Sequence, residues 1–215
     1  MATQDSLIDA IIMTNHLTAK QTLILKAAIK LFAEKGYSNT STNEIVSEAG
    51  VSEGSLFKKF KNKRGLLNTI LEPIIKNIIP SFFQEVSWQL LKEDTHSLYT
   101  IIKMMVDDRV NFVYKNIAIA KIFFSEILYA KNIKNKVTKN LPSKLVINLN
   151  QELYKLKREN ILIKWPNEEI INFLAYNIIG FVLNQFILSK KDLSAVKKQK
   201  KYLINFLVSG LSPAA

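Results

Sequence analysis

The sequence predicts an all-α protein, and three observations lead to that prediction. Glycine and proline are scarce, at 6 and 5 of 215 residues, so the chain lacks the turn-rich composition of a β fold. Apolar residues make up 48% of the chain, which is enough to bury a sizeable core. These apolar residues recur at spacings of three and four, the periodicity of amphipathic helices.

The N-terminal region is predicted to contain several short helices. Apolar residues over 7–12 share one helical face and predict a short amphipathic helix that either packs or frays. The next helix is expected from Thr18 to Lys35, and Gly36 follows at the position where helices end in a residue with positive φ.

Two still shorter helices follow, and each is expected to begin at a hydroxyl side chain. Thr42 is predicted to cap a helix over 43–49, which Gly50 ends. Ser52 is predicted to cap a second helix over 53–60.

The rest of the chain is expected to form longer helices. Asn62 or Lys63 opens a helix over 64–79, which Pro73 should kink and Pro80 should end. Beyond it, polar breaks separate apolar segments that are predicted to be helices over 82–93, 96–115, 117–132, 141–160, 167–189 and 193–210.

Charge and composition narrow the classes of partner. The net charge of +12 and a pI of about 9.7 favour a polyanionic partner, either nucleic acid or an anionic membrane surface. A lysine-rich soluble protein from an AT-rich genome is the plain alternative. The absence of cysteine excludes disulfides and thiolate metal sites, and it fits a reducing cytoplasm.

Secretion, membrane insertion and catalysis are not expected. The first residues carry Asp5 and Asp9 without a basic region, unlike a secretory signal. Lys, Asn or Pro interrupts every apolar run before it reaches the ~20 residues of a bilayer span. His16 and His96 lie far apart, and the sequence contains no HExxH motif, glycine-rich phosphate loop or nucleophile elbow. No cofactor or metal is therefore expected.

Residues 42–60 have the pattern of a helix-turn-helix. Gly50 supplies the tight turn between two short helices, and the polar start of the second helix is suited to contact base edges. The small apolar seam between the helices is expected to consist of Ile45, Val46, Ala49, Val51, Leu56 and Phe60.

The segment after the turn is strongly basic. Five basic residues and one acid, Glu53, leave a charge of +4 between Val51 and Gly65. Such a cluster can neutralise DNA phosphates, although a solvated basic helix end would look the same. The basic residues are Lys58, Lys59, Lys61, Lys63 and Arg64.

The segment from Thr18 to Leu67 resembles the DNA-binding domain of the tetracycline-repressor (TetR) family. The resemblance rests on the residues GYSNTSTNEIVSEAGVSEGSLFKKFKNKRGLL, which arrive in the family's order and spacing. It implies a repressor that works as a cytoplasmic homodimer on a palindromic operator and is released by a small molecule. It also implies an N-terminal extension over 1–17, a DNA-binding domain over 18–65 and a helical ligand-binding and dimerisation domain over 66–215.

The resemblance implies roles for single residues of the helix-turn-helix. Thr42 and Ser52 resemble caps that approach phosphates, and Lys63 resembles a lysine that meets a phosphate. Gly54 and Ser55 resemble the pair that faces the major groove.

Two residues of the recognition helix depart from the family pattern. Phe57 stands where tyrosine is usual and lacks the hydroxyl that touches the DNA backbone, a contact that Lys58 or Lys59 could replace. Glu53 stands where a neutral or basic residue is common. Its carboxylate either accepts a bond from cytosine N4 or simply favours the helix N-terminus.

The resemblance also places a dimer interface and an effector pocket in the remaining helices. The interface is expected on the last two long helices, although each of its residues could equally be protomer core: Phe173, Tyr176, Ile179, Gly180, Leu183 and Phe186. The pocket is expected to be lined by Trp88, Phe112, Phe123, Phe124, Ile127 and Tyr129.

The expected pocket lining is apolar and aromatic, which suggests a lipophilic effector that is aromatic or cationic. Asp107, Asp108 and Glu126 could meet a cation. Two other functions stay open at this point: a DNA-binding regulator without an effector, and a basic helical protein of the membrane surface.

Overall fold

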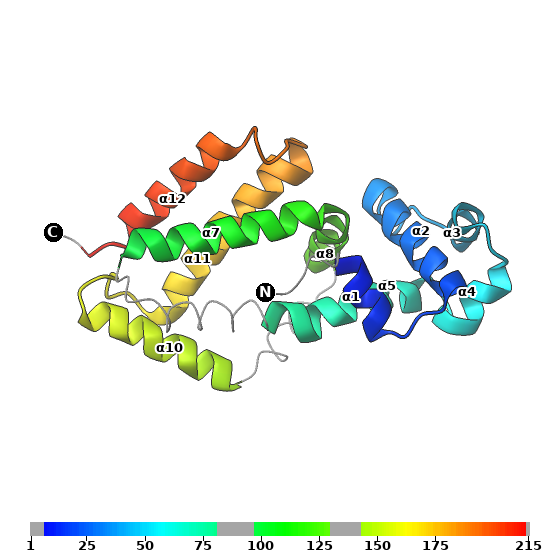
Figure 1. Cartoon of the computed structure of the whole chain (residues 1–215), viewed down its shortest axis with the longest axis horizontal. Helices are drawn as coiled ribbons and strands as arrows, with labels where there is room; N and C mark the ends of the chain where they lie inside the picture. Colours follow the sequence, from blue (N-terminus) through cyan, green and yellow to red (C-terminus); the bar gives the residue numbers. More distant parts are fainter. Residues whose placement is uncertain (1–6, 81–96, 130–142, 214–215) are drawn as a thin grey trace. The chain divides into compact units, whose positions relative to one another are not determined.

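The computed structural model describes residues 7–80, 97–129 and 143–213, and within these ranges the regular structure is helical throughout (Figure 1). Contacts group the chain into two compact units. The first comprises residues 1–79 and 116–140, and the second comprises residues 80–115 and 141–215. The functional division near residue 65 stays a prediction.

The first unit is built around one central helix. It contains α1 (Leu7–Thr14), α2 (Ala19–Lys35), α3 (Thr42–Ala49), α4 (Glu53–Phe60), α5 (Lys63–Pro73), the π-helical turn η1 (Ile74–Ile78) and α8 (Ile117–Tyr129). The central helix α2 packs against α3, α4, α5 and α8. It therefore buries residues on several sides: Ile24, Leu25, Ala27, Ala28, Ile29, Leu31 and Phe32.

Local signals account for both ends of α2. Thr18 Oγ1 accepts the amide of Gln21, and the Gln21 side chain accepts the amide of Thr18, which makes a reciprocal capping box. Gly36 ends the helix with a φ of 84°. The predicted helix from Thr18 to Lys35 is confirmed.

The N-terminal helix α1 packs on the first unit. Leu7 and Ile11 are buried, and α1 lies against α5. The amide of Leu7 donates to Asn116 Oδ1 at 3.1 Å. Of the two expectations for this segment, packing is confirmed.

Pro73 changes the helix rather than breaking it. Proline has no N–H to donate to the carbonyl four residues before it, and the helix widens into the π-helical turn η1 directly afterwards. The carbonyl left free, that of Thr69, lies 3.5 Å from the side-chain amide of Asn15. The predicted irregularity at Pro73 is therefore observed as a π-helical turn.

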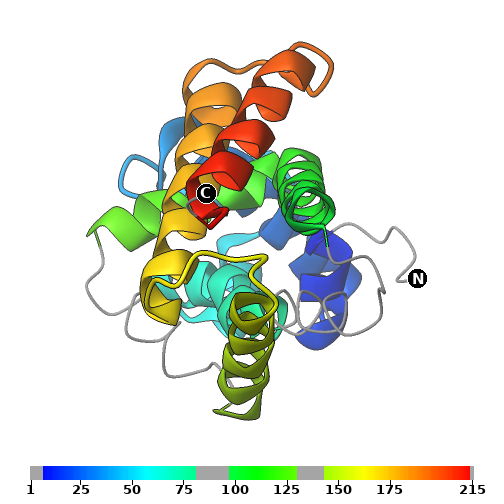
Figure 2. The same cartoon turned by 90° about the vertical axis from the view of Figure 1, so that its left-hand side faces the viewer.

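The second unit contains four helices in the described residues and one π-helical turn. They are α7 (Leu98–Lys115), α10 (Ser143–Arg158), α11 (Asn167–Val182) with η2 (Leu183–Leu188), and α12 (Lys197–Leu211). Figure 2 shows α11 and α12 running side by side, and both pack against α7. The contacts bury one apolar stripe of each helix, which includes Ile102 and Val106 of α7, Ile170 and Val182 of α11, and Ile204 and Leu207 of α12.

The predicted long helices agree with the structure except at one start. The last helix begins at Lys197 rather than at 193, because Asp192 Oδ1 accepts bonds from Ser194 Oγ and the Ala195 amide. These local bonds compete with helix formation. The predicted helix over 82–93 lies outside the described residues.

Helix α11 and η2 together form a continuous apolar helix. Residues Asn167–Leu188 span 22 residues with a mean hydropathy of 1.6 in their most apolar window, which passes a length and composition test for a membrane span. The expectation that no segment would pass is therefore wrong, because uncharged asparagines rather than charges interrupt this one. Since core helices of soluble proteins pass the same test, this result is weak evidence for a membrane.

Candidate nucleic-acid interface

Helices α3 and α4 meet at a glycine corner. Gly50 has φ 63° and ψ 34°, the left-handed conformation that glycine adopts without a steric penalty. The next amide, that of Val51, donates to Val46 O at 3.1 Å and closes the turn. Ile45, Leu56 and Phe60 fill the seam between the helices and are at most 3% exposed. The predicted helix-turn-helix corner is confirmed.

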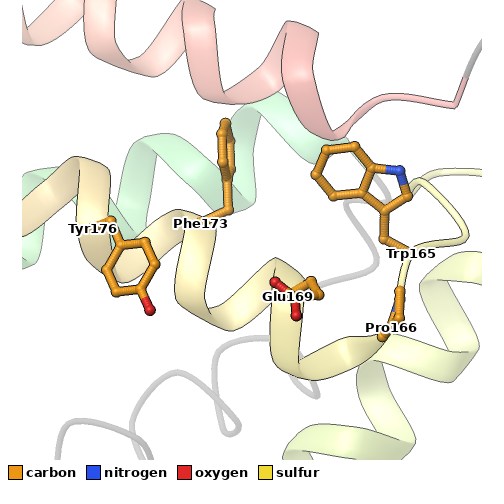
Figure 3. Close-up of a pocket in the computed structure, with 5 residues that line it drawn as sticks. All are labelled: Trp165, Pro166, Glu169, Phe173 and Tyr176. Atoms are coloured by element: carbon orange, nitrogen blue, oxygen red, sulfur yellow. The ribbon is translucent and has the colours of Figure 1, made fainter.

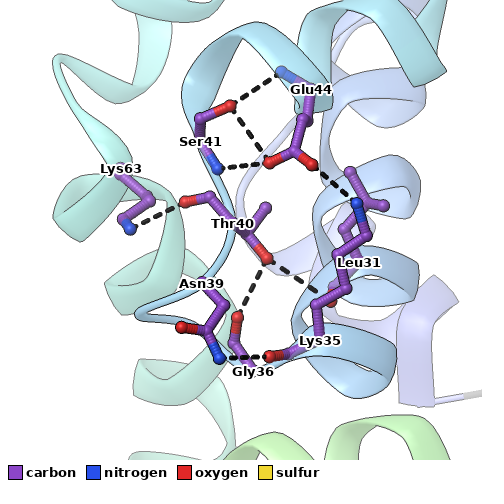
Figure 4. A network of polar contacts seen from close by, with 8 residues as sticks. All are labelled: Leu31, Lys35, Gly36, Asn39, Thr40, Ser41, Glu44 and Lys63. Atoms are coloured by element: carbon purple, nitrogen blue, oxygen red, sulfur yellow. Dashed lines mark hydrogen bonds and ion pairs between the residues drawn. The ribbon is translucent and has the colours of Figure 1, made fainter.

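Helix α3 begins one residue earlier than predicted, and its cap is Ser41 rather than Thr42 (Figure 4). Ser41 Oγ accepts the Glu44 amide at 3.1 Å, and the Glu44 carboxylate accepts the Ser41 amide at 2.8 Å. Only the register starting at Ser41 places a glutamate three residues later. Thr42 would pair with Ile45, which cannot return the bond. The prediction of Thr42 as a cap is therefore wrong.

A salt bridge joins this cap to the end of α2. Lys35 Nζ lies 2.6 Å from Glu44 Oε1. The bond from Lys35, followed by the two from Ser41, lowers the pKa of Glu44 to about 2. The start of α3 is thus held by an ionised carboxylate over the whole neutral range.

The loop between α2 and α3 is closed by its own polar groups (Figure 4). Thr40 is 1% exposed, and its hydroxyl donates to Gly36 O at 2.9 Å. The side-chain amide of Asn39 donates to Lys35 O at 3.0 Å. These bonds satisfy carbonyls at the end of α2 that the helix itself leaves unpaired.

Lys63 also holds this loop. Its ammonium donates to Thr40 O at 2.7 Å and Tyr37 O at 2.9 Å, and lies 4.5 Å from the centre of the Tyr37 ring. Lys63 is the first residue of α5, and Asn62 caps that helix by accepting the Gly65 amide at 2.8 Å. The predicted phosphate contact of Lys63 stays a prediction, and the structure adds a role in fixing the loop before α3.

The outward face of α4 is polar and open at its N-terminal end. Ser52 occupies the predicted cap position but makes no capping bond, and its hydroxyl lies 3.1 Å from that of Ser55. Glu53 and Gly54 are exposed, and Ser55 is partly exposed. The side chains and backbone of this first turn are therefore accessible to an external partner.

Gly54 has no structural reason to lack a side chain. A Cβ atom at this position would meet nothing within 4 Å. Gly65 is the contrast, because a Cβ there would lie 2.0 Å from Phe60 O. Glycine inside a helix costs about 1 kcal/mol relative to alanine, so Gly54 is unfavourable for the free protein.

The remaining predicted DNA-binding residues lie along the same helix. Phe57 exposes 42% of its surface, which is unusual for a phenyl ring without a partner. Lys58 and Lys59 are exposed, and Lys59 Nζ donates to Asn15 O at 3.3 Å. Helix α4 thus presents an apolar ring and two cations on its solvent side.

The predicted effector-pocket residues are only partly assembled. Phe123 and Phe124 of α8 lie with their ring centres 5.9 Å apart, and Phe112 lies on α7 in the other compact unit. Ile127 and Tyr129 belong to α8, and their side chains lie outside the described set, as does Trp88.

The three acids considered for a cation all have partners inside the protein. Asp107 lies 2.6 Å from both Lys103 and Lys200. Burial raises its pKa, but the bonds from these two lysines outweigh burial and leave the pKa below its usual value. Asp108 pairs with Arg109 at 2.7 Å, and Glu126 pairs with Arg64 at 3.3 Å.

The predicted dimer residues divide between surface and core. Tyr176 is 70% exposed and Ile179 is 41% exposed, and the neighbouring Gly180 is also exposed. Phe173 and Leu183 are partly exposed. Phe186 is 3% exposed and packs on Tyr114 with ring centres 5.2 Å apart, so it belongs to the protomer core.

Sequence reasoning missed several residues that build the interface. The reciprocal pair Ser41 and Glu44 had a readable signal, the Ser-x-x-Glu spacing of a capping box. The contacts of Lys35, Thr40 and Lys63 had none, because they depend on how α2, α3 and α5 come together.

Comparison with known proteins agrees with the geometry of this interface. Residues 24–70 match the family model described as bacterial regulatory proteins, tetR family. The uncharacterized HTH-type transcriptional regulator YvkB of Bacillus subtilis is 28% identical over 191 residues, covering 88% of this chain and 95% of that protein. An HTH-type transcriptional regulator of Staphylococcus aureus is 24% identical over 182 residues, covering 85% and 89%.

Solved structures share the fold at low sequence identity. The transcriptional regulator FadR from Bacillus subtilis, solved in complex with stearoyl-CoA, has a TM-score of 0.61 at 20% identity and covers 87% of this chain and 97% of its own. FadR from Bacillus halodurans also has a TM-score of 0.61 at 20% identity, covering 90% and 97%. The curated relatives are transcriptional regulators rather than enzymes.

Proposed function

Since the chain belongs to the TetR family of transcriptional regulators, we propose that it is a cytoplasmic repressor that binds a palindromic operator as a homodimer and leaves it when a small lipophilic effector binds. The observation that carries this proposal is the open N-terminal turn of α4 beside the glycine corner at Gly50. A helix presented in this way is the element that enters the major groove in helix-turn-helix proteins.

The residues of α4 are suited to different parts of a DNA contact. Gly54 and Ser55 are proposed to approach base edges, because a glycine that costs stability and fills no space leaves room for a partner. Thr42, Ser52 and Lys63 are proposed to meet phosphates, and Lys58 and Lys59 would add charge beside Phe57. For Glu53 we favour a role at the helix N-terminus, where a carboxylate is stabilising.

An exposed apolar face supports the homodimer. Tyr176 and Ile179 of α11 are exposed, and α12 adds Tyr202 and Phe206, which are 58% and 56% exposed. Large exposed apolar patches commonly mark contacts between proteins. Two copies joined through this face would carry two recognition helices, which must lie ~34–36 Å apart to enter successive major grooves.

The effector is the least specified part of the proposal. The aromatic residues predicted to line its pocket, such as Phe112 and Phe123, favour a lipophilic molecule. The fold is shared with a FadR that was solved with stearoyl-CoA, a molecule with a long apolar chain. Release would follow if the effector prefers a dimer in which the recognition helices are spaced differently.

A gel-shift titration tests the proposal directly. The protein is titrated onto the DNA upstream of its own gene and onto shuffled duplexes of equal length and composition, at several salt concentrations. Lys58→Gln is expected to weaken binding to all duplexes and to reduce the salt slope by about 0.9. Ser55→Ala is expected to change the preference among duplexes instead. Equal affinity for the upstream and shuffled DNA would overturn the proposal.

A further inference from the structure

A pocket of about 310 Å³ opens at the start of α11, away from the residues proposed for the effector (Figure 3). It is lined by Trp165, Pro166, Glu169, Phe173 and Tyr176. All five residues come from one stretch of the second compact unit. The volume lies at the lower end of the range for sites of small molecules.

The backbone that carries Trp165 is anchored to α10. Lys157 Nζ donates to Trp165 O at 2.5 Å and also to Asn167 Oδ1. The side-chain amide of Asn167 in turn donates to Asn150 Oδ1 at 2.7 Å. The turn between α10 and α11 is therefore fixed by polar bonds, which gives the pocket a defined wall.

The aromatic side of the pocket is held by packing. The rings of Trp165 and Phe173 meet edge to face, with centres 6.3 Å apart at an angle of 86°. Phe173 also packs on Phe206, 6.0 Å away, and on Gly210 of α12, where a Cβ atom would come within 3.3 Å of the ring. Trp165 and Tyr176 keep 45% and 70% of their surfaces exposed.

Glu169 gives the pocket its charge. Figure 3 shows the Glu169 carboxylate in the space between Trp165 and Tyr176. Within the described parts of the chain, no basic side chain forms an ion pair with it. The acids considered from the sequence are all paired internally, so Glu169 differs from them in being open to a ligand.

These features select one class of ligand. Aromatic faces attract cations through their quadrupoles, and a carboxylate attracts them by charge. The same carboxylate repels fatty acids and phosphates. We infer that the pocket formed by Trp165, Glu169, Phe173 and Tyr176 binds a small organic cation, such as a quaternary ammonium group. The inference does not depend on operator binding, because the site can be assayed in the free protein.

Two probes of equal shape isolate the charge. Choline and 3,3-dimethylbutan-1-ol differ in having nitrogen or carbon at the centre of three methyl groups. In a Trp88→Phe protein labelled with 5-fluorotryptophan, Trp165 is the one remaining tryptophan, and its ¹⁹F signal reports on the pocket. Choline is expected to shift this signal saturably, with an affinity about five-fold higher than that of the neutral alcohol.

Glu169→Gln and Glu168→Gln form a matched pair of variants. Both change a carboxylate in the first turn of α11, but only Glu169 lines the pocket. Glu169→Gln is expected to lower the affinity for choline about five-fold and to leave the affinity for the alcohol unchanged. Glu168→Gln is expected to change neither affinity.

Three results would overturn the inference. The first is equal affinity for the two probes, and the second is equal behaviour of the two variants. The third concerns Phe173 and Tyr176, which also belong to the proposed dimer face. If choline bound only after the dimer was dissociated by Gly180→Leu, a second copy of the chain would be the occupant of the pocket instead.

Discussion

At the scale of single residues, a few side chains decide where α3 begins. Ser41 and Glu44 bond reciprocally, and Lys35 holds Glu44 from the last turn of α2. Lys63 binds the carbonyls of the same loop from the start of α5. The first helix of the DNA-reading pair is thus positioned by side chains from α2, α3 and α5, which couples its placement to the packing of the unit.

Alanine substitutions distinguish the cap from its neighbour. Ser41→Ala is expected to lower the free energy of unfolding by about 1 kcal/mol, the usual cost of losing a capping hydroxyl. Thr42→Ala removes no capping bond and is expected to cost less than half as much, while weakening DNA binding. Thermal unfolding followed by circular dichroism measures both. A larger loss of stability for Thr42→Ala would contradict the assignment of the cap.

The low pKa of Glu44 predicts a pH dependence of stability. The folded-state pKa of about 2 lies below the model value of 4.5, so the ionised carboxylate stabilises the fold fully above about pH 4.5. That contribution is lost as the pH falls toward 2. Glu44→Gln should therefore be less stable than the wild type at pH 7, with a difference in melting temperature that shrinks below pH 4.5.

A second carboxylate provides the control for this experiment. Glu53 lies in the first turn of α4 and makes no capping bond there. Glu53→Gln is expected to show a smaller difference from the wild type that changes less with pH. A difference for Glu44→Gln that stays constant from pH 7 to pH 3 would count against the ionised cap.

At the scale of secondary structure, α4 carries a residue that costs it stability. Gly54→Ala is expected to raise the free energy of unfolding by up to about 1 kcal/mol, because the new methyl group meets nothing within 4 Å. The same change is expected to weaken operator binding if the backbone at Gly54 approaches the DNA. Denaturant unfolding and gel shifts on one preparation measure both effects. Unchanged affinity would place the helix differently in the groove.

Helix ends were predictable wherever a local signal decides them. Thr18 and Gly36 bound α2, and Gly50 ends α3, as their side chains and φ preferences indicate. The start of α3 was predicted one residue late because hydroxyls at both Ser41 and Thr42 satisfy a cap in isolation. Only the glutamate three residues later decides between them.

The environment of side chains in the second unit was less predictable. Phe186 fits an exposed helical stripe by spacing, yet it lies against Tyr114 because η2 turns it toward α7. The pocket at Trp165 escaped prediction because its shape depends on the turn that Lys157 and Asn167 hold together. Sequence periodicity defines a face, whereas packing partners decide which face is covered.

At the scale of the whole molecule, the exposed face of α11 and α12 predicts a dimer that one substitution can separate from folding. A Cβ atom at Gly180 would meet nothing within the protomer. Gly180→Leu should therefore leave the protomer at least as stable, while its side chain blocks close approach of a second copy. Analytical ultracentrifugation is expected to show a shift from dimer to monomer. A dimer of unchanged affinity would show that the interface lies elsewhere.

The place of α8 in the first unit limits how the DNA-reading part of this protein could be transplanted. Helix α8 covers α2 and pairs Glu126 with Arg64, although it comes much later in the chain. A gene fragment that stops at Ile79 would encode α2 without this cover and would expose apolar surface that favours aggregation. A chimeric regulator that borrows this head would need the later helix as well, so the natural point of exchange is not a single cut in the gene.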